Sequence, residues 1–439
     1  NYQAHRLVVS ASDDGSSFRE VARLTPARHG WQNLDAPNTH VIPPTTARYF
    51  RLSWDPAGTE PGSEDLDAAK WKPSLGIREL HLSGEPKIGQ YEGKSAAVWR
   101  IAPETTAGEL PAGNCVNPAE VRDLTASLQD GRLRAGALPE GRWRILRLGH
   151  TSTGHVNATG GAGKGLECDK FNPKAVEKQF DGWFAEIFRQ VGPELAGRVL
   201  KIMHVDSWEC GSQNWSENFA AEFRRRRGYD LMPWLPLYAG IPMGSAEQSE
   251  KVLRDIRETA AELVADVFYR TLAKLGHEYG CRFTAECVSP TMTSDGMLHY
   301  RETDIPMGEC WLRSPTHDKP NDMLDAIHGA HIYGKNIVQA EGFTQLRTMW
   351  DEHPGMIKTM LDRNYALGIN KIVYHVYVHN PWLDRKPGMT LDGIGLYMQR
   401  DQTWWNQGRA WVDYAKRCQA LLQRGVPVTD VAVFTGEDV

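Results

Sequence analysis

Acidic residues stand at the ends of several short apolar runs in the middle of this sequence. Asp206 and Glu209 follow one such run, and Glu286, Glu309 and Glu341 lie at the ends of three later ones. Hydrolysis of a glycosidic bond requires two carboxyl groups, because one protonates the leaving oxygen while the other activates water or attacks the anomeric carbon. Mutual repulsion in a dry pocket keeps one member of such a pair protonated near neutral pH. These residues therefore predict acid–base chemistry on a sugar.

A metal site and a structural role are the alternatives for these residues. Three or four carboxylates can hold Ca²⁺ or Mg²⁺, and this use is compatible with catalysis because carboxylates beyond the catalytic pair can bind a cation. Hydrogen bonds to the neighbouring backbone explain Glu286, in TAECVSP, equally well, and a buried structural role explains His204, inside its apolar run. The sequence alone assigns no metal ligand.

Aromatic and histidine side chains occur beside the same positions. Tryptophan faces pack against the apolar C–H faces of sugars, and two histidines follow the last apolar run at a spacing that puts them on one face of a strand. The candidate substrate-binding residues are Asp206, Trp208, Glu286, Trp311, His375, His379 and Trp382.

Buried strands must position these side chains. From about residue 141 the sequence alternates strand-like apolar runs with helical patterns, such as those over 174–191 and 254–278. The predicted strands are Arg142–Gly149, Val199–Val205, Arg282–Cys287, Ile305–Trp311, Asn336–Phe343 and Lys371–Val378. This alternation is typical of a parallel sheet covered by helices, and its length favours a (β/α)8-type barrel over 141–425. Active sites of such barrels lie at the C-terminal ends of the strands, where the acidic residues stand.

The segment before the barrel has a different pattern. Residues 1–88 alternate short strand-like runs with turn clusters, which predicts an all-β sandwich. The order of the pieces VVSASDDGSSFREVARL, ARYFRLSW and LGIRELHLSGEP resembles a discoidin-like jelly roll. Residues 89–140 predict an irregular connector, and 426–439 the start of a following domain. Both ends interrupt a strand-like pattern, so we expect a piece of a longer protein.

Composition and motifs exclude several classes of function. The 439 residues carry 50 Lys+Arg and 55 Asp+Glu, with no basic patch typical of nucleic-acid binding and no apolar run long enough to span a membrane. No G-x-G-x-x-G, P-loop or G-x-S-x-G motif occurs, and the seven cysteines show no zinc-binding spacing. The basic run Arg224–Arg227 precedes Gly228 and predicts a solvated helix end.

Five segments in the barrel region resemble one enzyme family. TSTGHVNATGGAGKGLECDKFNPKAVEKQFDGW, HVDSWECGSQNWSENFAAEFRRRRGYDLMPWLP, PMGECW, IVQAEGFT and YHVYVHNPW occur in the order found in family-106 glycoside hydrolases, the α-L-rhamnosidases. The resemblance covers roughly residues 141–439. It implies an inverting enzyme that removes α-linked L-rhamnose from plant-type glycans, assisted by Ca²⁺, in a protein exported by bacteria.

The same resemblance implies roles for three glutamates. Glu209 of DSWE matches the general acid, Glu341 of QAEG the general base, and Glu309 of GECW a third essential glutamate that acts as base or as metal or substrate ligand. The resemblance leaves the metal ligands unassigned. The alternatives are a retaining, β-galactosidase-like barrel glycosidase and a carbohydrate-binding protein without catalysis. The three glutamates argue against the second, and the sequence leaves the oligomeric state open.

Overall fold

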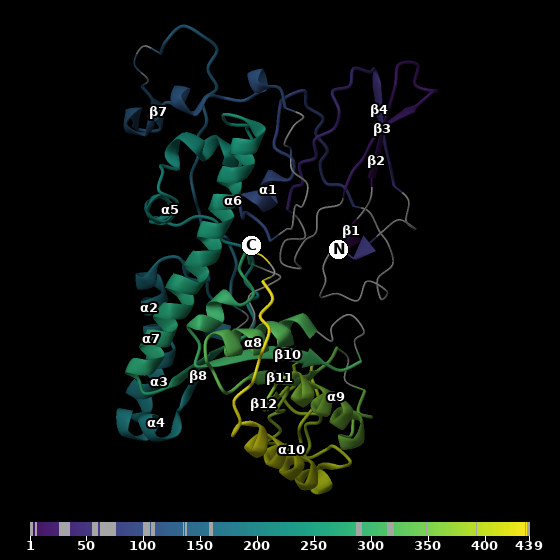
Figure 1. The fold of residues 1–439 in the computed structure, drawn as a ribbon, viewed down its shortest axis with the longest axis vertical. Coiled ribbons are helices and arrows are strands. Elements are labelled where there is room, and N and C mark those ends of the chain that lie inside the picture. The colour runs from purple at the N-terminus through teal and green to yellow at the C-terminus, as the bar shows by residue number, and fades with distance from the viewer. Residues whose placement is uncertain are drawn as a thin grey trace.

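The chain forms a mixed α/β structure, described by a computed structural model (Figure 1). The structure describes residues 3–4, 7–25, 36–54, 60–61, 76–99, 106, 110–134, 136, 138–157, 161–286, 292–313, 320–346, 349–391, 393–434 and 436. Among these residues, no helix combines the length and apolar character that crossing a bilayer requires.

A small antiparallel sheet lies near the N-terminus. Its strands run in the order β3 (Arg19–Arg23), β2 (Leu7–Ser12) and β4 (Tyr49–Trp54), and Val9 and Ala11 of the central strand are buried. A further pair of two-residue strands joins β1 (Gln3–Ala4) to β5 (Glu60–Pro61). These strands agree with the all-β character predicted for this segment.

The predicted sandwich is not confirmed. Its third piece, LGIRELHLSGEP, forms no strand over the described residues 76–86, and Ile77, Leu80 and Leu82 are exposed there. A strand needs a neighbour to receive its backbone hydrogen bonds, and none pairs with this piece in the part of the chain that the structure describes.

Short elements follow up to the main sheet. They are α1 (Tyr91–Lys94), η4 (Ala112–Asn114), η5 (Pro118–Glu120), η6 (Thr125–Ser127), β6 (Leu128–Gln129), β7 (Arg132–Leu133) and η7 (Gly161–Gly163). The strand predicted over Arg142–Gly149 is absent: the segment is irregular and exposed, with Ile145 63% exposed. Its alternating Arg and apolar residues resemble the pattern of a half-buried strand, but no strand in the described part of the chain pairs with it.

Five parallel strands form the main sheet. They are β8 (Ile202–Val205), β9 (Arg282–Ala285), β10 (Ile305–Trp311), β11 (Gln339–Thr344) and β12 (Lys371–Tyr374), and each pairs with the next in the chain. They confirm the last five of the six predicted strands. Sequential parallel order gives a curled, half-barrel sheet with helical crossovers. A full eight-stranded barrel is not confirmed by the described residues.

Helices cover this sheet and connect its successive strands along the chain. α2 to α7 lie to one side in Figure 1, and α8 to α10 lie near β10, β11 and β12. Their bounds are α2 (Pro173–Gly182), α3 (Phe184–Val191), α4 (Pro193–Val199), α5 (Phe219–Arg227), η8 (Met232–Ala239), α6 (Ala246–Leu263), the π-helix η9 (Val264–Tyr269), α7 (Arg270–Glu278), η10 (Leu298–Arg301), α8 (Pro320–Ile332), α9 (Pro354–Leu367), η11 (Trp405–Gln407) and α10 (Gly408–Leu422).

The two predicted helices form with interruptions. The helix expected over 174–191 breaks at Trp183, whose backbone leaves the helical region at φ −126° and ψ −72°. The helix expected over 254–278 contains the π-helix, a local widening that hydrophobic periodicity does not reveal.

Close packing of α8 on β10 shows which face of the sheet this helix covers. A Cβ added to Gly308 would lie 2.8 Å from the carbonyl oxygen of Asp322 in α8. Gly308 therefore faces the helix. Because side chains alternate along a strand, Glu309 faces the opposite side of the sheet.

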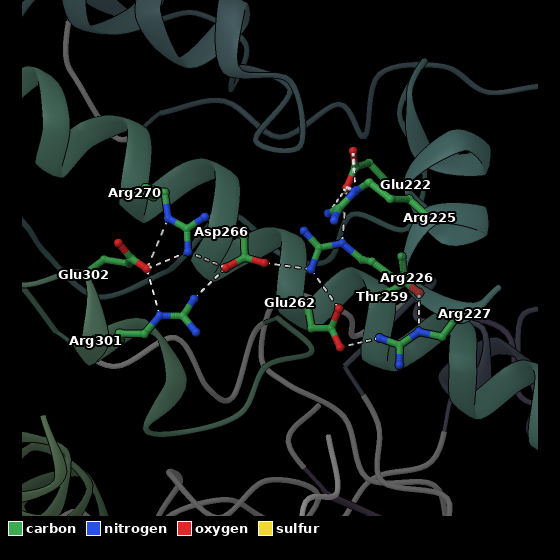
Figure 2. A network of polar contacts seen from close by, with 10 residues as sticks. All are labelled: Glu222, Arg225, Arg226, Arg227, Thr259, Glu262, Asp266, Arg270, Arg301 and Glu302. Carbon is green, nitrogen blue, oxygen red and sulfur yellow. Dashed lines mark hydrogen bonds and ion pairs between the residues drawn. The ribbon is translucent and has the colours of Figure 1, made fainter.

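The arginine run at the end of α5 is less solvated than predicted. Gly228 ends the helix in the left-handed conformation, as expected, but the side chains of Arg226 and Arg227 are only 9% and 14% exposed. Arg226 contacts Glu262 and Asp266 at 2.7 Å each (Figure 2). These contacts join α5 to the α6–η9 helix, so the run ties two elements together.

Candidate active site

Glu309 and Glu341 are direct neighbours on adjacent strands. They are Cα partners in the parallel pairing of β10 with β11, so their side chains leave the sheet on the same face. Glu309 is 5% exposed and Glu341 is 9% exposed. Two carboxyl groups are therefore buried side by side on the face opposite α8.

Glu286, at the end of the neighbouring strand β9, lies close to this pair. It follows β9 directly, and its N–H group donates to the carbonyl oxygen of Val205 at 3.1 Å, which continues the ladder with β8. Carboxylate oxygens of Glu286, Glu309 and Glu341 all lie within 4.8 Å of one another, and Glu286 is 1% exposed. Three carboxylates this close and this buried repel one another unless a proton or a cation lies among them.

Hydrogen bonds orient two of these carboxylates. The Trp311 Nε1–H group donates to Oε2 of Glu309 at 2.9 Å. Oε1 of Glu341 accepts from the Thr344 hydroxyl and lies 3.7 Å from Nδ1 of His375. Trp311, Glu341 and His375, predicted from sequence as site residues, are thus brought together here.

Thr344 reaches Glu341 through an irregularity that sequence reasoning missed. The pairing of β10 with β11 shifts after Cys310, so that Trp311 lies opposite Thr344 and Phe343 is the extra residue, with φ 72°. Such a bulge re-aims the side chains around it. The only hint of this contact in the sequence is that Thr344 follows Glu341 by three residues, at the end of a predicted buried strand.

A second group of donors surrounds Glu286. Donor atoms of His204, Asp206 and Glu286 also lie within 4.8 Å of one another, and Nε2 of His204 is 3.4 Å from Oδ1 of Asp206. The His204 hydrogen bond is the main cause of a lowered pKa of Asp206, which burial opposes. Glu286 belongs to both groups and connects them.

The loop after β8 places Glu209 at the surface and Trp208 in the core. The Ser207 hydroxyl donates to Oε1 of the exposed Glu209 at 3.1 Å. Trp208 is buried, donates from Nε1 to the Gly211 carbonyl oxygen at 2.8 Å, and packs edge-on against Phe268. Its ring therefore does not present a face to a sugar, contrary to our expectation for it.

His379 and Trp382 lie on the exposed segment after β12. His379 forms an isolated bridge with Met389, and its ring centroid is 6.5 Å from that of Tyr377. Trp382 is 53% exposed, with the Arg385 guanidinium 5.1 Å from its ring centroid. Both side chains are available for contact with a ligand, and neither belongs to the two donor groups.

Comparisons with known proteins identify the family of the chain. The sequence profile of glycoside hydrolase family 106, described as α-L-rhamnosidase, matches residues 7–439. A protein of Formosa agariphila with the provisional name β-glucuronidase is 40% identical over 330 residues, which are 75% of this chain and 28% of that protein. A rhamnosidase from Novosphingobium sp. PP1Y has a similar structure, with a TM-score of 0.78 and 28% sequence identity. The match covers 99% of this chain and 40% of that protein's chain.

The chain thus spans less than half the length of either relative. The family profile nevertheless extends over almost all of its residues, including every glutamate discussed above. The chain belongs to glycoside hydrolase family 106, the α-L-rhamnosidases.

Proposed function

We propose that this chain carries the catalytic site of a hydrolase that releases terminal α-linked L-rhamnose from glycans, built on a (β/α)8-type barrel. The observation that carries the proposal is the burial of Glu286, Glu309 and Glu341 together at the ends of three neighbouring parallel strands. Membership of the α-L-rhamnosidase family and the rhamnosidase neighbour support the choice of sugar.

Glu341 is suited to activate the attacking water. Its contacts with Thr344 and His375 are both at Oε1, so the carboxylate is oriented while Oε2 can accept a proton from water. Removal of that proton as water attacks the anomeric carbon is general-base catalysis.

Glu209 is suited to protonate the leaving oxygen. Its exposed position on the loop after β8 allows it to take up a proton from solvent between turnovers, and Ser207 holds one of its oxygens. For inversion, we expect its carboxyl group to lie about 6.5–9.5 Å from that of Glu341 when substrate is bound. Glu309, held by Trp311, is the third glutamate, acting on the substrate or on a cation.

The donors present fit a calcium ion. Ca²⁺ binds six to eight oxygen ligands, and Glu286 and Glu309 supply carboxylate oxygens beyond the proposed acid and base, which suits it better than the set containing His204. When bound, Ca²⁺ would offset the charge of these carboxylates and coordinate sugar hydroxyls. Asp206 is close enough to Glu286 to extend the set.

Hydrolysis of an aryl α-L-rhamnoside by the full chain, followed by proton NMR, tests the proposal. We expect the first-formed rhamnose to have the inverted configuration, whereas the retained anomer would contradict the mechanism. Aryl β-D-glucuronide and β-D-galactoside belong in the same panel because of the name of the Formosa relative and the galactosidase alternative. Release from either one, with no release of rhamnose, would replace the proposed substrate. Rhamnose binding without any turnover would favour a carbohydrate-binding protein.

A further inference from the structure

The backbone of Glu286 is held at both of its polar groups. Its N–H group bonds to Val205, as described above, and its carbonyl oxygen lies 2.8 Å from Nε2 of His299 in η10. The ladder of β9 with β10 ends at the pair Ala285 and Pro306, one residue before Glu286. The His299 imidazole is the hydrogen-bond partner of the Glu286 carbonyl oxygen just beyond this end of the ladder.

The chemistry of this contact fixes the state of the histidine. A carbonyl oxygen only accepts, so Nε2 of His299 carries a proton, and in a neutral ring Nδ1 is then unprotonated. Nδ1 is buried and has no hydrogen-bond partner among the described residues. Burial lowers the pKa of His299 to about 4, so the ring is neutral at the pH of any ordinary assay.

The turn that carries His299 is itself firmly held. The His299 ring packs against Tyr269, the last residue of the π-helix, and against Tyr300, with ring centroids 4.9 and 4.0 Å away. The Tyr300 hydroxyl donates to the carbonyl oxygen of Met307 in β10 at 2.6 Å. Arg301 contacts Asp266 of the π-helix at 2.5 Å. Arg270 forms ion pairs with both Asp266 and Glu302, and Glu302 also pairs with Arg301 (Figure 2).

We propose that His299 is a positioning residue: its Nε2–H group holds the Glu286 carbonyl and so keeps the Glu286 carboxylate beside Glu309 and Glu341. With both backbone groups fixed, the direction of the Cα–Cβ bond of Glu286 is fixed as well. The inference rests on the proposed function, in which Glu286 serves the substrate or the cation.

Two replacements of similar size separate hydrogen bonding from packing. His299→Gln retains an N–H donor, whereas His299→Met fills the space without one. For hydrolysis of the aryl α-L-rhamnoside we expect kcat to fall about 10- to 100-fold in His299→Met and to recover most of that loss in His299→Gln. His328→Gln, an exposed histidine in α8, is the matched control and keeps wild-type activity. Equal kcat in the Met and Gln variants would overturn the inference.

A double-variant comparison shows whether His299 acts through Glu286. If it does, adding His299→Met to Glu286→Gln lowers kcat by less than about twofold further, because the group being positioned has already been changed. If the fold-losses in kcat of the two single variants multiply in the double variant, His299 does not act through Glu286. Wild-type activity in Glu286→Gln alone would remove Glu286 from the proposed function, which is a different failure from that of the histidine.

Two further measurements do not depend on the size of kcat. The pH–rate profile of His299→Gln should keep the shape of the wild-type profile, because a neutral positioning group transfers no proton, and loss of one limb would contradict this role. The rise in melting temperature on adding Ca²⁺ should be smaller in His299→Met than in His299→Gln. An unchanged rise in both variants would contradict the positioning of Glu286.

Discussion

At the scale of single residues, burial decides what the site glutamates can do. Glu341 lies 9% exposed beside Glu309, with its orientation set by Thr344. We expect Glu341→Gln to lower kcat by at least about 10³-fold, because the amide cannot accept the proton of water, while L-rhamnose still binds. Steady-state kinetics and rhamnose titration check this. Glu194→Gln, on the surface of α4, is the control. Turnover retained in Glu341→Gln would transfer the role of base to Glu309 or Glu286.

Trp311 offers a second test at this scale. Phenylalanine keeps most of its ring but removes the Nε1–H group that donates to Glu309. A hydrogen bond to a buried charged group contributes about 1.5–3 kcal/mol, so we expect Trp311→Phe to lower kcat/KM by about 10- to 100-fold. Trp183→Phe, at an exposed ring, should have no effect on the kinetics. Equal kinetics for both variants would show that Glu309 needs no orientation by Trp311.

At the scale of elements, the contact of α8 with β10 supports the paired glutamates from behind. A Cβ at Gly308 would lie 2.8 Å from the backbone of Asp322, which helix α8 can relieve only by moving. We expect Gly308→Ala to destabilise the fold by about 1–3 kcal/mol and to lower the melting temperature. At Gly182 a Cβ meets nothing, so Gly182→Ala should leave stability unchanged or raise it slightly. A neutral Gly308→Ala would mean that α8 does not fix β10.

The ion network at the π-helix links elements in a pH-dependent way (Figure 2). Burial would raise the pKa of Asp266, but the hydrogen bond from Arg226 and the nearby arginine charges lower it overall. A lowered folded-state pKa gives stability that is present above the unfolded value of about 3.9 and is lost as pH falls through the folded value.

Asp266→Asn should therefore cost about 1–3 kcal/mol at neutral pH, and the difference from wild type should shrink below about pH 4. Urea unfolding at several pH values measures the difference. Asp181→Asn, at an exposed aspartate in α2, should show no such trend. A difference that stays constant down to low pH would show that the Asp266 charge is not what joins these helices.

At the scale of the whole molecule, the sequence correctly predicted elements that appear as buried apolar runs. It did not predict features that depend on which segments lie side by side in the folded chain. The five parallel strands of the main sheet were predictable because each is a short apolar run ending at a candidate site residue. Residues 142–149 show a similar apolar pattern, yet no strand among the described residues pairs with them, and periodicity does not reveal whether a pairing partner exists. Trp208 was misassigned for a related reason, since a tryptophan beside candidate site residues can equally well anchor its loop in the core. The bulge at Phe343 and the contact from His299 depend on three-dimensional register, which sequence alone does not give.

A cation bound at the carboxylates would join several strands of the sheet, because its candidate ligands come from three of them. Asp206 follows β8, Glu286 follows β9 and Glu309 lies in β10. Ca²⁺ at 100 times its Kd would stabilise the folded chain by about 2.7 kcal/mol, provided that it does not bind the unfolded chain. We therefore expect chelation to lower the melting temperature by about 2–5 °C and to abolish activity, and added Ca²⁺ to restore both. Glu286→Gln should lose most of this response, whereas Glu194→Gln should keep it. An equal response in the two variants would place the cation elsewhere and leave the three buried carboxylates to share protons instead.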